Sequence, residues 1–304
     1  MAGRLLRSLS ALAALGAVGG IAFLVVTRPA PLPESHWRQA GAPDLVNGEM
    51  MFSAGGCVSC HAAPGAKDGE RLTLAGGQVF KTAFGTFHAP NISPDETAGI
   101  GAWTLAEFAN ALTRGVGRNG EHLYPALPYT SYVRMTPRDV GDLFAYLRTL
   151  PKSAHVAPPH ELGFPFNIRL ALGGWKFLYF TERPRVALAS ADDRVSRGQY
   201  LVEGPGHCGE CHSPRDSLGG FVADQWLAGA PNPDGPGVIP NITPGGKNVK
   251  NWSEADIATY LETGFTPDFD TVGGSMVEVQ KNMGKLSAED RQAIAAYLKA
   301  IPAR

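Results

Sequence analysis

All four cysteines of this 304-residue chain lie in two copies of one pattern, Cys-x-x-Cys-His. The first copy runs from Cys57 to His61, and the second runs from Cys208 to His212. Two thiols one helical turn apart can each add to a vinyl group of one porphyrin, and the histidine that follows points back at the iron. The pattern therefore predicts two covalently bound haem c groups, with attachment and proximal ligation by Cys57, Cys60, His61, Cys208, Cys211 and His212.

Other cysteine chemistries fit the pattern less well. A thioredoxin-like redox pair needs no histidine directly after the second cysteine. Two Cys-x-x-Cys pairs could form one Cys₄ zinc site, but such pairs usually lie much closer together than the 151 residues between Cys57 and Cys208. Neither alternative uses His61 and His212.

The chain repeats itself at an interval of about 150 residues. Pro90-Asn91-Ile92-Ser93-Pro94 matches Pro240-Asn241-Ile242-Thr243-Pro244, and Trp103 matches Trp252. Each copy holds one Cys-x-x-Cys-His pattern. The repeat predicts two tandem, class I-like cytochrome c domains, at residues 42–155 and 191–304.

Capping patterns place the helices of both predicted domains. Thr104 and Ser253 each precede an acidic residue by three positions, which is typical of a capping box. Thr136 and Ser287 are placed to open the last helix of each domain. Strand signals are few, so we expect a mainly α fold.

The N-terminus contains an uncharged run of 20 residues from Ser8 to Thr27, preceded by Arg4 and Arg7. At about 1.5 Å per residue, this run is long enough to cross a bilayer. The positive-inside rule keeps the arginines in the cytoplasm and sends the rest of the chain across. Residues 1–30 are predicted to be a membrane anchor or a cleaved signal peptide. The lack of a convincing Ala-x-Ala-like cleavage site favours the anchor. The expected location is the periplasmic side of a bacterial inner membrane, or the soluble periplasm if the segment is cleaved.

The connector at residues 156–190 is unusually apolar. Its large apolar residues are Phe164, Phe166, Trp175, Phe177, Leu178, Tyr179 and Phe180. Two interpretations are open: packing across the interface between the domains, or a patch that meets the membrane surface or a partner. The formal charge of −1 gives no indication of a nucleic-acid partner.

The second axial ligand of each iron separates an electron carrier from an enzyme that needs an open coordination position. A methionine is the candidate in each domain, although most methionines only fill a core. Met135 is the candidate in the first domain. Met276 and Met283 are both possible in the second, and the glycines at 273 and 274 favour Met276 because they let backbone approach a cofactor closely.

The remaining histidines are not expected to be ligands. His88 is expected to hydrogen-bond a haem propionate or loop backbone, and His207 directly precedes Cys208 and cannot easily turn onto the same iron. Arg215 could pair with a propionate or lie in solvent. The histidines expected at the surface are His36, His122, His155 and His160.

A family resemblance rests on several segments of both halves. The first runs from Gly85 through Asn91 and Trp103 to Met135, and the second runs from Gly273 to Val279 with the helix around Tyr297. Residues 45–304 resemble the multihaem cytochrome c subunits of membrane-bound bacterial alcohol, gluconate and sugar-alcohol dehydrogenases. The resemblance implies Met135 and Met276 as axial ligands. Those subunits usually carry three haems and a C-terminal membrane segment, whereas this sequence predicts two haems and holds an N-terminal apolar segment.

These features predict a dihaem cytochrome that relays single electrons and is not an enzyme by itself. The donor would be a periplasmic dehydrogenase or a quinol-linked complex, and the acceptor a terminal oxidase or a soluble cytochrome. The alternative is a dihaem redox enzyme of the peroxidase or thiosulfate dehydrogenase type. A peroxidase needs a displaceable ligand, and thiosulfate chemistry favours a cysteine ligand, for which no cysteine is left over. A third interpretation is a subunit that holds a catalytic partner at the membrane.

Overall fold

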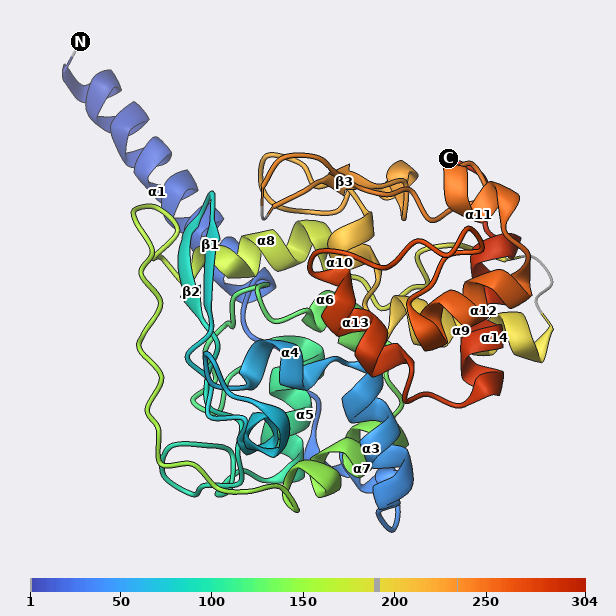
Figure 1. The fold of residues 1–304 in the computed structure, drawn as a ribbon. Helices are drawn as coiled ribbons and strands as arrows, with labels where there is room; N and C mark the ends of the chain where they lie inside the picture. The colour runs from blue at the N-terminus through green and yellow to red at the C-terminus, as the bar shows by residue number, and fades with distance from the viewer. Residues whose placement is uncertain (1, 189–191, 234) are drawn as a thin grey trace.

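The computed structural model describes residues 2–188, 192–233 and 235–304. The predicted boundary between the connector and the second domain, at 190–191, lies outside the described residues, as does Met1. One long helix, α1 (Ala2–Val26), projects from a helical body (Figure 1). The predicted mainly α class is confirmed.

Each half of the body contains the same series of helices. In the first half they are α3 (Leu45–Ala54), α4 (Cys57–His61), α5 (Leu105–Arg114), α6 (Tyr129–Tyr132) and α7 (Pro137–Leu147). In the second half they are α9 (Asp193–Glu203), α10 (Gly209–His212), α12 (Glu254–Thr263), α13 (Met276–Met283) and α14 (Ala288–Ala300). The other α-helices in the described residues are α2 (Glu34–Trp37), α8 (Ala171–Tyr179) and α11 (Lys247–Asn251).

The predicted capping residues begin the helices as expected. The side-chain oxygens of Thr104 and Ser253 accept hydrogen bonds from backbone N–H groups at 3.2 and 3.1 Å, and both caps form complete capping boxes. Thr136 and Ser287 cap α7 and α14 in the same way, each at 3.1 Å. Each such cap stabilises its helix by about 1 kcal/mol, so local sequence sets these boundaries.

The first and last helices of each half cross at a glycine. A Cβ on Gly48 of α3 would lie 2.2 Å from the carbonyl oxygen of Asp142 on α7. A Cβ on Gly198 of α9 would lie 1.9 Å from the carbonyl oxygen of Ala293 on α14. Both helix pairs therefore pack backbone against backbone, which only glycine allows.

The strands in the part of the chain that the structure describes are short and form two hairpins. Strands β1 (Val79–Thr82) and β2 (Gly85–His88) are antiparallel, with Val79 opposite His88. Strands β3 (Ala230–Pro231) and β4 (Val238–Ile239) are also antiparallel. Figure 1 shows the β1–β2 hairpin reaching toward the end of α1 at the body.

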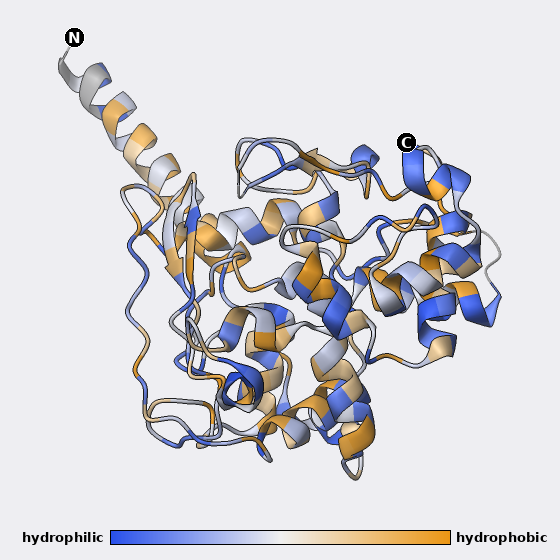
Figure 2. Ribbon diagram, viewed as in Figure 1, coloured by the Kyte–Doolittle hydropathy of each residue, from blue (hydrophilic) through white to orange (hydrophobic). Residues whose placement is uncertain are grey.

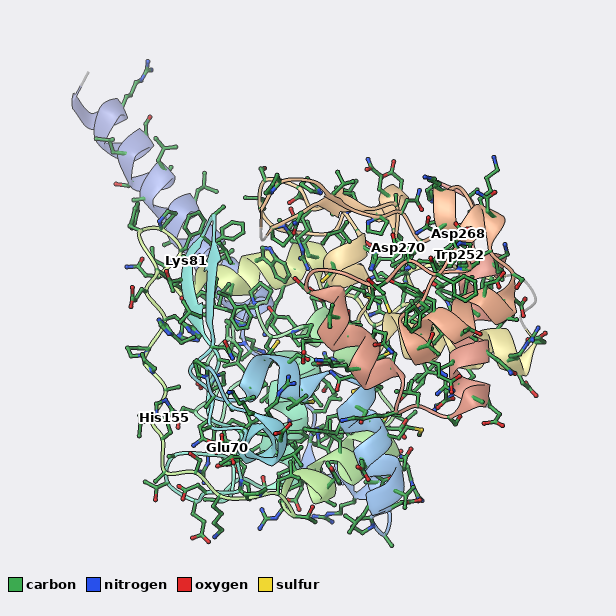
Figure 3. All side chains as sticks on the ribbon, in the orientation of Figure 1. Glu70, Lys81, His155, Trp252, Asp268 and Asp270 are labelled. Atoms are coloured by element: carbon green, nitrogen blue, oxygen red, sulfur yellow. The ribbon has the colours of Figure 1, made fainter. Side chains whose placement is uncertain are left out.

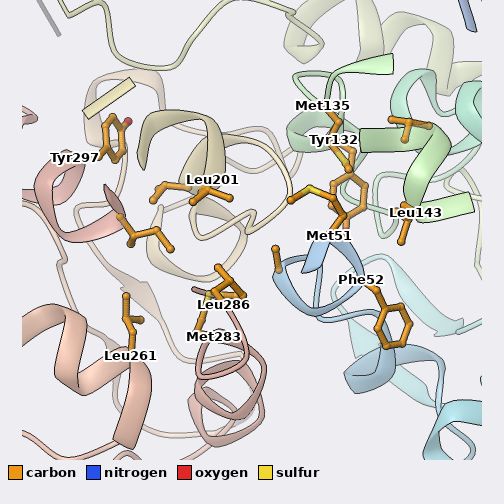
Figure 4. Close-up of a cluster of buried hydrophobic side chains, with 14 of the residues drawn as sticks. Met51, Phe52, Tyr132, Met135, Leu143, Leu201, Leu261, Met283, Leu286 and Tyr297 are labelled. Atoms are coloured by element: carbon orange, nitrogen blue, oxygen red, sulfur yellow. The ribbon is translucent and has the colours of Figure 1, made fainter. Parts of the chain in front are cut away.

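The hydrophobic core is continuous between the halves. Met51, Tyr132 and Met135 of the first half belong to the same buried cluster as Leu201 and Met283 of the second, and Figure 4 shows them. Polar contacts reinforce this interface at its edges. Asn282 Nδ2 donates to Ser59 Oγ at 3.0 Å, Arg71 pairs with Glu278, and the Tyr200 hydroxyl donates to Asp139.

The connector uses one face for packing and leaves another exposed. Trp175 Nε1 donates to the Leu218 carbonyl at 2.9 Å, and the Tyr179 hydroxyl donates to Asp216 at 2.8 Å. Lys176 Nζ donates to the Arg114 carbonyl at 2.8 Å, at the end of α5. The connector thus packs across both halves, as one of the two interpretations expected. Phe177 and Leu178 remain exposed.

Candidate haem sites

The two histidines predicted as proximal ligands have equivalent hydrogen-bond partners in the two halves. His61 Nδ1 lies 2.8 Å from the Pro90 carbonyl oxygen, and His212 Nδ1 lies 2.7 Å from that of Pro240. A carbonyl only accepts, so Nδ1 carries the proton in both rings. The lone pair on each Nε2 is then available to an iron, as proximal ligation requires.

Asparagine side chains hold the two proline carbonyls in place. Asn91 Oδ1 accepts from the Ser93 N–H and Asn241 Oδ1 from the Thr243 N–H, both at 2.8 Å. Their amide nitrogens donate to backbone carbonyls beyond the last helix of each half. Sequence reasoning used the Pro-Asn-Ile-Ser/Thr-Pro motif only to detect the repeat and missed the role of Pro90 and Pro240. The sequence signal that could have indicated this role is that the motif occurs once after each Cys-x-x-Cys-His pattern.

A glycine in each half ties the motif's loop to the attachment helix. The N–H groups of Gly76 and Gly229 donate to the carbonyls of His61 and His212 at 2.7 and 2.8 Å. The two glycines have φ angles of 75° and 88°. A Cβ on Gly76 would lie 2.5 Å from the Pro90 carbonyl carbon, so glycine is required there.

Burial sets the protonation of the candidate ligands. It lowers the pKa of His61 and of His212, against the smaller opposing effect of the proline carbonyls. The neutral imidazole, which is the form that binds iron, is therefore favoured. Burial, with a smaller contribution from the neighbouring cysteine, raises the pKa of Cys57 and of Cys208 to about 12.

A zinc site finds no support. Within the residues that the structure describes, no group of three or more His, Cys, Asp or Glu side chains is placed to hold a metal ion. The two cysteine pairs therefore do not converge on a Cys₄ site.

A cavity of about 450 Å³ adjoins the second attachment motif. Cys208, Cys211 and His212 line it, and so do Met276 and Met283 on α13. Its walls are mostly apolar, as expected of a cofactor site. The residues present fit a haem: an attachment pair, an imidazole with a free Nε2 and thioether ligands in one apolar cavity.

The structure leaves the choice between the two methionines of α13 open. Met276 is the first residue of the helix and Met283 the last, so the expectation that Met276 lies in a glycine-rich loop holds only for the residues before it. Met283 is buried, whereas Met276 is half-buried. In the first half, Met135 is buried between α6 and α7, next to Tyr132 (Figure 4). Met276 and Met135 remain predictions as ligands.

Comparison with known proteins identifies the family. The cytochrome c family model matches residues 45–151. A dihaem c-type cytochrome of Cereibacter sphaeroides is 51% identical over 298 residues, which cover 98% of this chain and 99% of that protein. The chain belongs to the cytochrome c family. Covalently bound haem c and an electron-transfer role come with that membership.

Two further relatives are subunits of dehydrogenases, as the resemblance predicted. The fructose dehydrogenase cytochrome subunit of Gluconobacter japonicus is 37% identical over 277 residues, 90% of this cytochrome and 55% of that subunit. The gluconate 2-dehydrogenase cytochrome c subunit of Pantoea cypripedii is 33% identical over 275 residues, 88% of this chain and 61% of that subunit. This cytochrome thus spans little more than half the length of these two subunits.

The remaining histidines differ partly from expectation. His155 is exposed as expected, whereas His36 and His160 are half-buried. The prediction that His122 is a surface residue is wrong: it is 4% exposed, and its Nε2 donates to the Thr27 carbonyl at 2.9 Å. The packing of the end of α1 on the body buries it, which its polar sequence context did not indicate.

His88, His207 and Arg215 of the cytochrome each have a defined environment. Among the described residues, the buried His88 ring has no loop-backbone hydrogen-bond partner, contrary to one expectation, and its Nε2 lies 3.5 Å from a Glu161 carboxylate oxygen. His207 Nε2 donates to the Gly55 carbonyl at 3.2 Å. Arg215 pairs with Glu210 and stacks on Phe221, so it is not simply in solvent. Pairing of His88 or Arg215 with a propionate stays a prediction.

Proposed function

We propose that this protein is a membrane-anchored, periplasmic dihaem cytochrome c that relays single electrons. Its donor is a dehydrogenase or a quinol-linked complex, and its acceptor is a terminal oxidase or a soluble cytochrome. Two tandem class I-like domains, at 42–155 and 191–304, each hold one haem c. The repeated helix series and the two matching histidine–proline contacts support this arrangement.

The observation that best supports electron relay is the contact between the two attachment segments. His207 directly precedes Cys208, and Gly55 lies two residues before Cys57. The Gly55 carbonyl accepts from His207 Nε2 at 3.2 Å and from the Tyr132 hydroxyl at 3.3 Å. Because both haems are attached beside this contact, an electron has a short route from one domain to the other within one chain.

Methionine ligation suits a carrier. When bound, haem c supplies one-electron chemistry, and histidine–methionine ligation raises its potential and leaves no open position for substrate. His61 with Met135, and His212 with Met276, would hold the two irons, with Met283 as the other candidate in the second domain. The chain's own part is to fix the imidazoles through Pro90 and Pro240 and, in the second half, to surround the group with an apolar cavity.

A dehydrogenase donor is supported by the names of the relatives. The proteins similar to this chain include cytochrome subunits of fructose, gluconate and alcohol dehydrogenases. An electron released by substrate oxidation in such a partner would enter at one haem and leave from the other. Association with a dehydrogenase also accommodates the interpretation of the chain as a subunit that holds its partner at the membrane.

Membrane anchoring is supported by α1. Residues Arg7–Val26 form a helix with a mean hydropathy of 2.3, and none of it is buried in the body. Figure 2 shows α1 mostly orange or pale outside the body. Thr27, at its end, is buried by His122 and Gly173. Cleavage of a signal near this point would remove part of the packed body, which favours retention over cleavage.

The relay is tested with the full-length protein in nanodiscs. One donor and one acceptor cytochrome are supplied, and electron passage is followed by absorbance. The His212→Ala variant should still accept an electron at one haem but fail to complete the transfer from donor to acceptor, while the wild type completes it. The matched control is His155→Ala, at an exposed histidine, which should behave as the wild type.

The same sample separates the relay from the enzyme alternative. Given alcohols, sugars, thiosulfate or peroxide without a partner, the protein should show no sustained turnover. Carbon monoxide should not bind the native reduced protein, because both irons are six-coordinate. Rapid turnover by the pure protein would overturn the relay and establish the dihaem redox enzyme.

A further inference from the structure

The end of α1 is packed against the connector helix α8. A Cβ on Gly173 would lie 2.3 Å from the Thr27 carbonyl oxygen, and one on Gly174 would lie 3.2 Å from the Phe23 ring. The two glycines directly follow Leu172 and are the third and fourth residues of α8. The end of α1 and the first turn of α8 are therefore in close contact at the two glycines, where α8 has no side chain. This contact fixes α8 relative to any membrane that α1 enters.

An exposed apolar stripe continues along α8 from that contact. Phe177 and Leu178 lie three and four residues after Gly174, so all three share one face of the helix. Their side chains are 68% and 63% exposed. Lys176 and Trp175 point elsewhere, because they bond to the carbonyls of Arg114 and Leu218. The stripe thus lies on the side of α8 where α1 passes, not on the side that packs on the body.

Residues just before α8 extend the apolar surface. Together with the stripe they form what we call the collar: Phe164, Phe166, Ile168, Leu170, Phe177 and Leu178, every one of them exposed. Phe166 packs edge-to-face on Phe84 of the β1–β2 turn, with ring centroids 5.1 Å apart. Figure 1 shows this hairpin and α8 together at the root of α1.

Basic side chains flank the collar. Arg28 lies two residues after the end of α1 and Lys81 lies on the hairpin, and both are exposed. Figure 3 labels Lys81 beside the root of α1. Aromatic and aliphatic side chains rimmed by basic groups are typical of surfaces that lie in the headgroup region of a bilayer.

We propose that the collar is immersed in the periplasmic leaflet's interface, so that the protein touches the bilayer at α1 and at the collar. The proposal rests on α1 being the membrane anchor of the proposed function. Phe23 belongs to the 20-residue apolar span, and its contact with Gly174 brings Phe177 and Leu178 to about the depth at which α1 leaves the hydrocarbon. Two contacts fix the tilt of the body, whereas a single helix would let the haem domains swing.

A bilayer explains the surface better than a protein partner does. The collar is continuous with the membrane span, so a partner that covered it would also have to enter the headgroup layer beside α1. Immersion by about 5–10 Å, usual for an interfacial helix, is enough to cover side chains on one face of α8. The bilayer alone can therefore remove the collar's apolar side chains from water, without a second protein.

The test uses a thiol placed in the collar. In the holoprotein the four native cysteines are taken up by haem attachment, so Phe177→Cys and Leu178→Cys each introduce one reactive thiol. The matched control is Phe269→Cys, at a side chain that is 86% exposed. Its neighbours Asp268 and Asp270 lie in the right half of the view, away from α1 at the upper left (Figure 3). Each variant is reconstituted at one copy per nanodisc, and its haem spectrum verifies folding.

A charged maleimide then measures how fast each thiol reacts. We expect the collar thiols to react at least about tenfold more slowly than the control, because the bilayer excludes the reagent and disfavours the thiolate. After denaturation all three should react alike. Equal rates in the intact discs would overturn the proposal, and so would protection that begins only when a partner dehydrogenase is added.

Mass spectrometry of the disc-bound protein distinguishes the possible failures. If α1 is present and the collar thiols react fast, the collar proposal alone fails. If the mature chain lacks α1, the anchor of the proposed function fails and the collar proposal fails with it. Loss of electron relay would leave the labelling pattern unchanged, because thiol protection does not depend on redox activity.

Discussion

The hydroxyl of Tyr297 donates a hydrogen bond of 2.6 Å to the carboxylate of Glu203, and both side chains are fully buried. Glu203 also accepts from the Arg185 and Val186 N–H groups at the end of the connector. Arg134 of the first half lies 3.5 Å from the same carboxylate. One buried charge therefore joins α9, α14, the connector and the first half.

Replacing Glu203 should destabilise the protein strongly. Glu203→Ala leaves the buried Arg134 without its ion-pair partner and two backbone N–H groups without their acceptor, and loss of one partner of a buried ion pair costs about 3–5 kcal/mol. Tyr297→Phe removes one bond only and should cost about 1 kcal/mol. Chemical denaturation of the two variants checks the order. Equal losses would show that the hydroxyl, not the carboxylate, organises the junction.

The helix crossings should not tolerate a methyl group. Gly198→Ala forces α9 away from the Ala293 carbonyl, and overpacking of this kind costs about 1–3 kcal/mol or more. Gly48→Ala should act in the same way on α3 and α7. The control is Gly69→Ala, at a position where a Cβ would meet nothing within 4 Å. Thermal unfolding monitored by circular dichroism should show lower transition temperatures for Gly48→Ala and Gly198→Ala alone.

The axial methionines can be assigned by spectroscopy. The near-infrared band of methionine-to-iron charge transfer should account for two haems per chain. Met135→Ala should remove about half of it, and Met276→Ala the other half. If Met283→Ala removes the band while Met276→Ala leaves it, Met283 is the ligand of the second haem.

The junction between α1 and the body should weaken in acid. Burial, followed by repulsion from Lys176, lowers the pKa of His122 below its usual 6.5. The unfolded chain then takes up a proton at a pH where the folded one does not, so stability falls as the pH drops below about 6.5. Above that pH the contribution of His122 is fully present.

His122→Gln tests this dependence, because a glutamine amide can still donate a hydrogen bond without titrating. Unfolding temperatures of the wild type and the variant are compared between pH 7.5 and 5.5. The wild type should lose more stability over this range than the variant. Parallel curves would assign the acid sensitivity to other groups, such as His160, whose pKa is also lowered by burial.

Local sequence was sufficient to predict a feature wherever the interactions that form it lie within a few consecutive residues. The caps at Thr104 and Ser253 were predictable because an N-cap bonds within its own first turn. The Cys-x-x-Cys-His pattern likewise predicted attachment and a proximal histidine within five residues. Neither prediction depends on distant parts of the chain.

Contacts between distant segments were not predictable in this way. The sequence indicated the apolar connector but not which face of α8 stays exposed, since that depends on where Lys176 and Trp175 find carbonyl partners. The sequence predicted His122 at the surface, because no residue near it in sequence indicates that the end of α1 packs on it. Two methionines at opposite ends of α13 line one cavity, so their order in the chain does not choose between them.

By itself the sequence determined the haem chemistry, the repeat, the helix starts and the apolar N-terminal span, all of which are encoded in short or periodic patterns. Only the tertiary structure decided that Pro90 and Pro240 orient the histidines, that Glu203 is buried at a four-way junction, and that the attachment segments meet at Gly55 and His207. Those features are long-range hydrogen bonds and close backbone contacts. They exist only once residues far apart in the chain have been packed together.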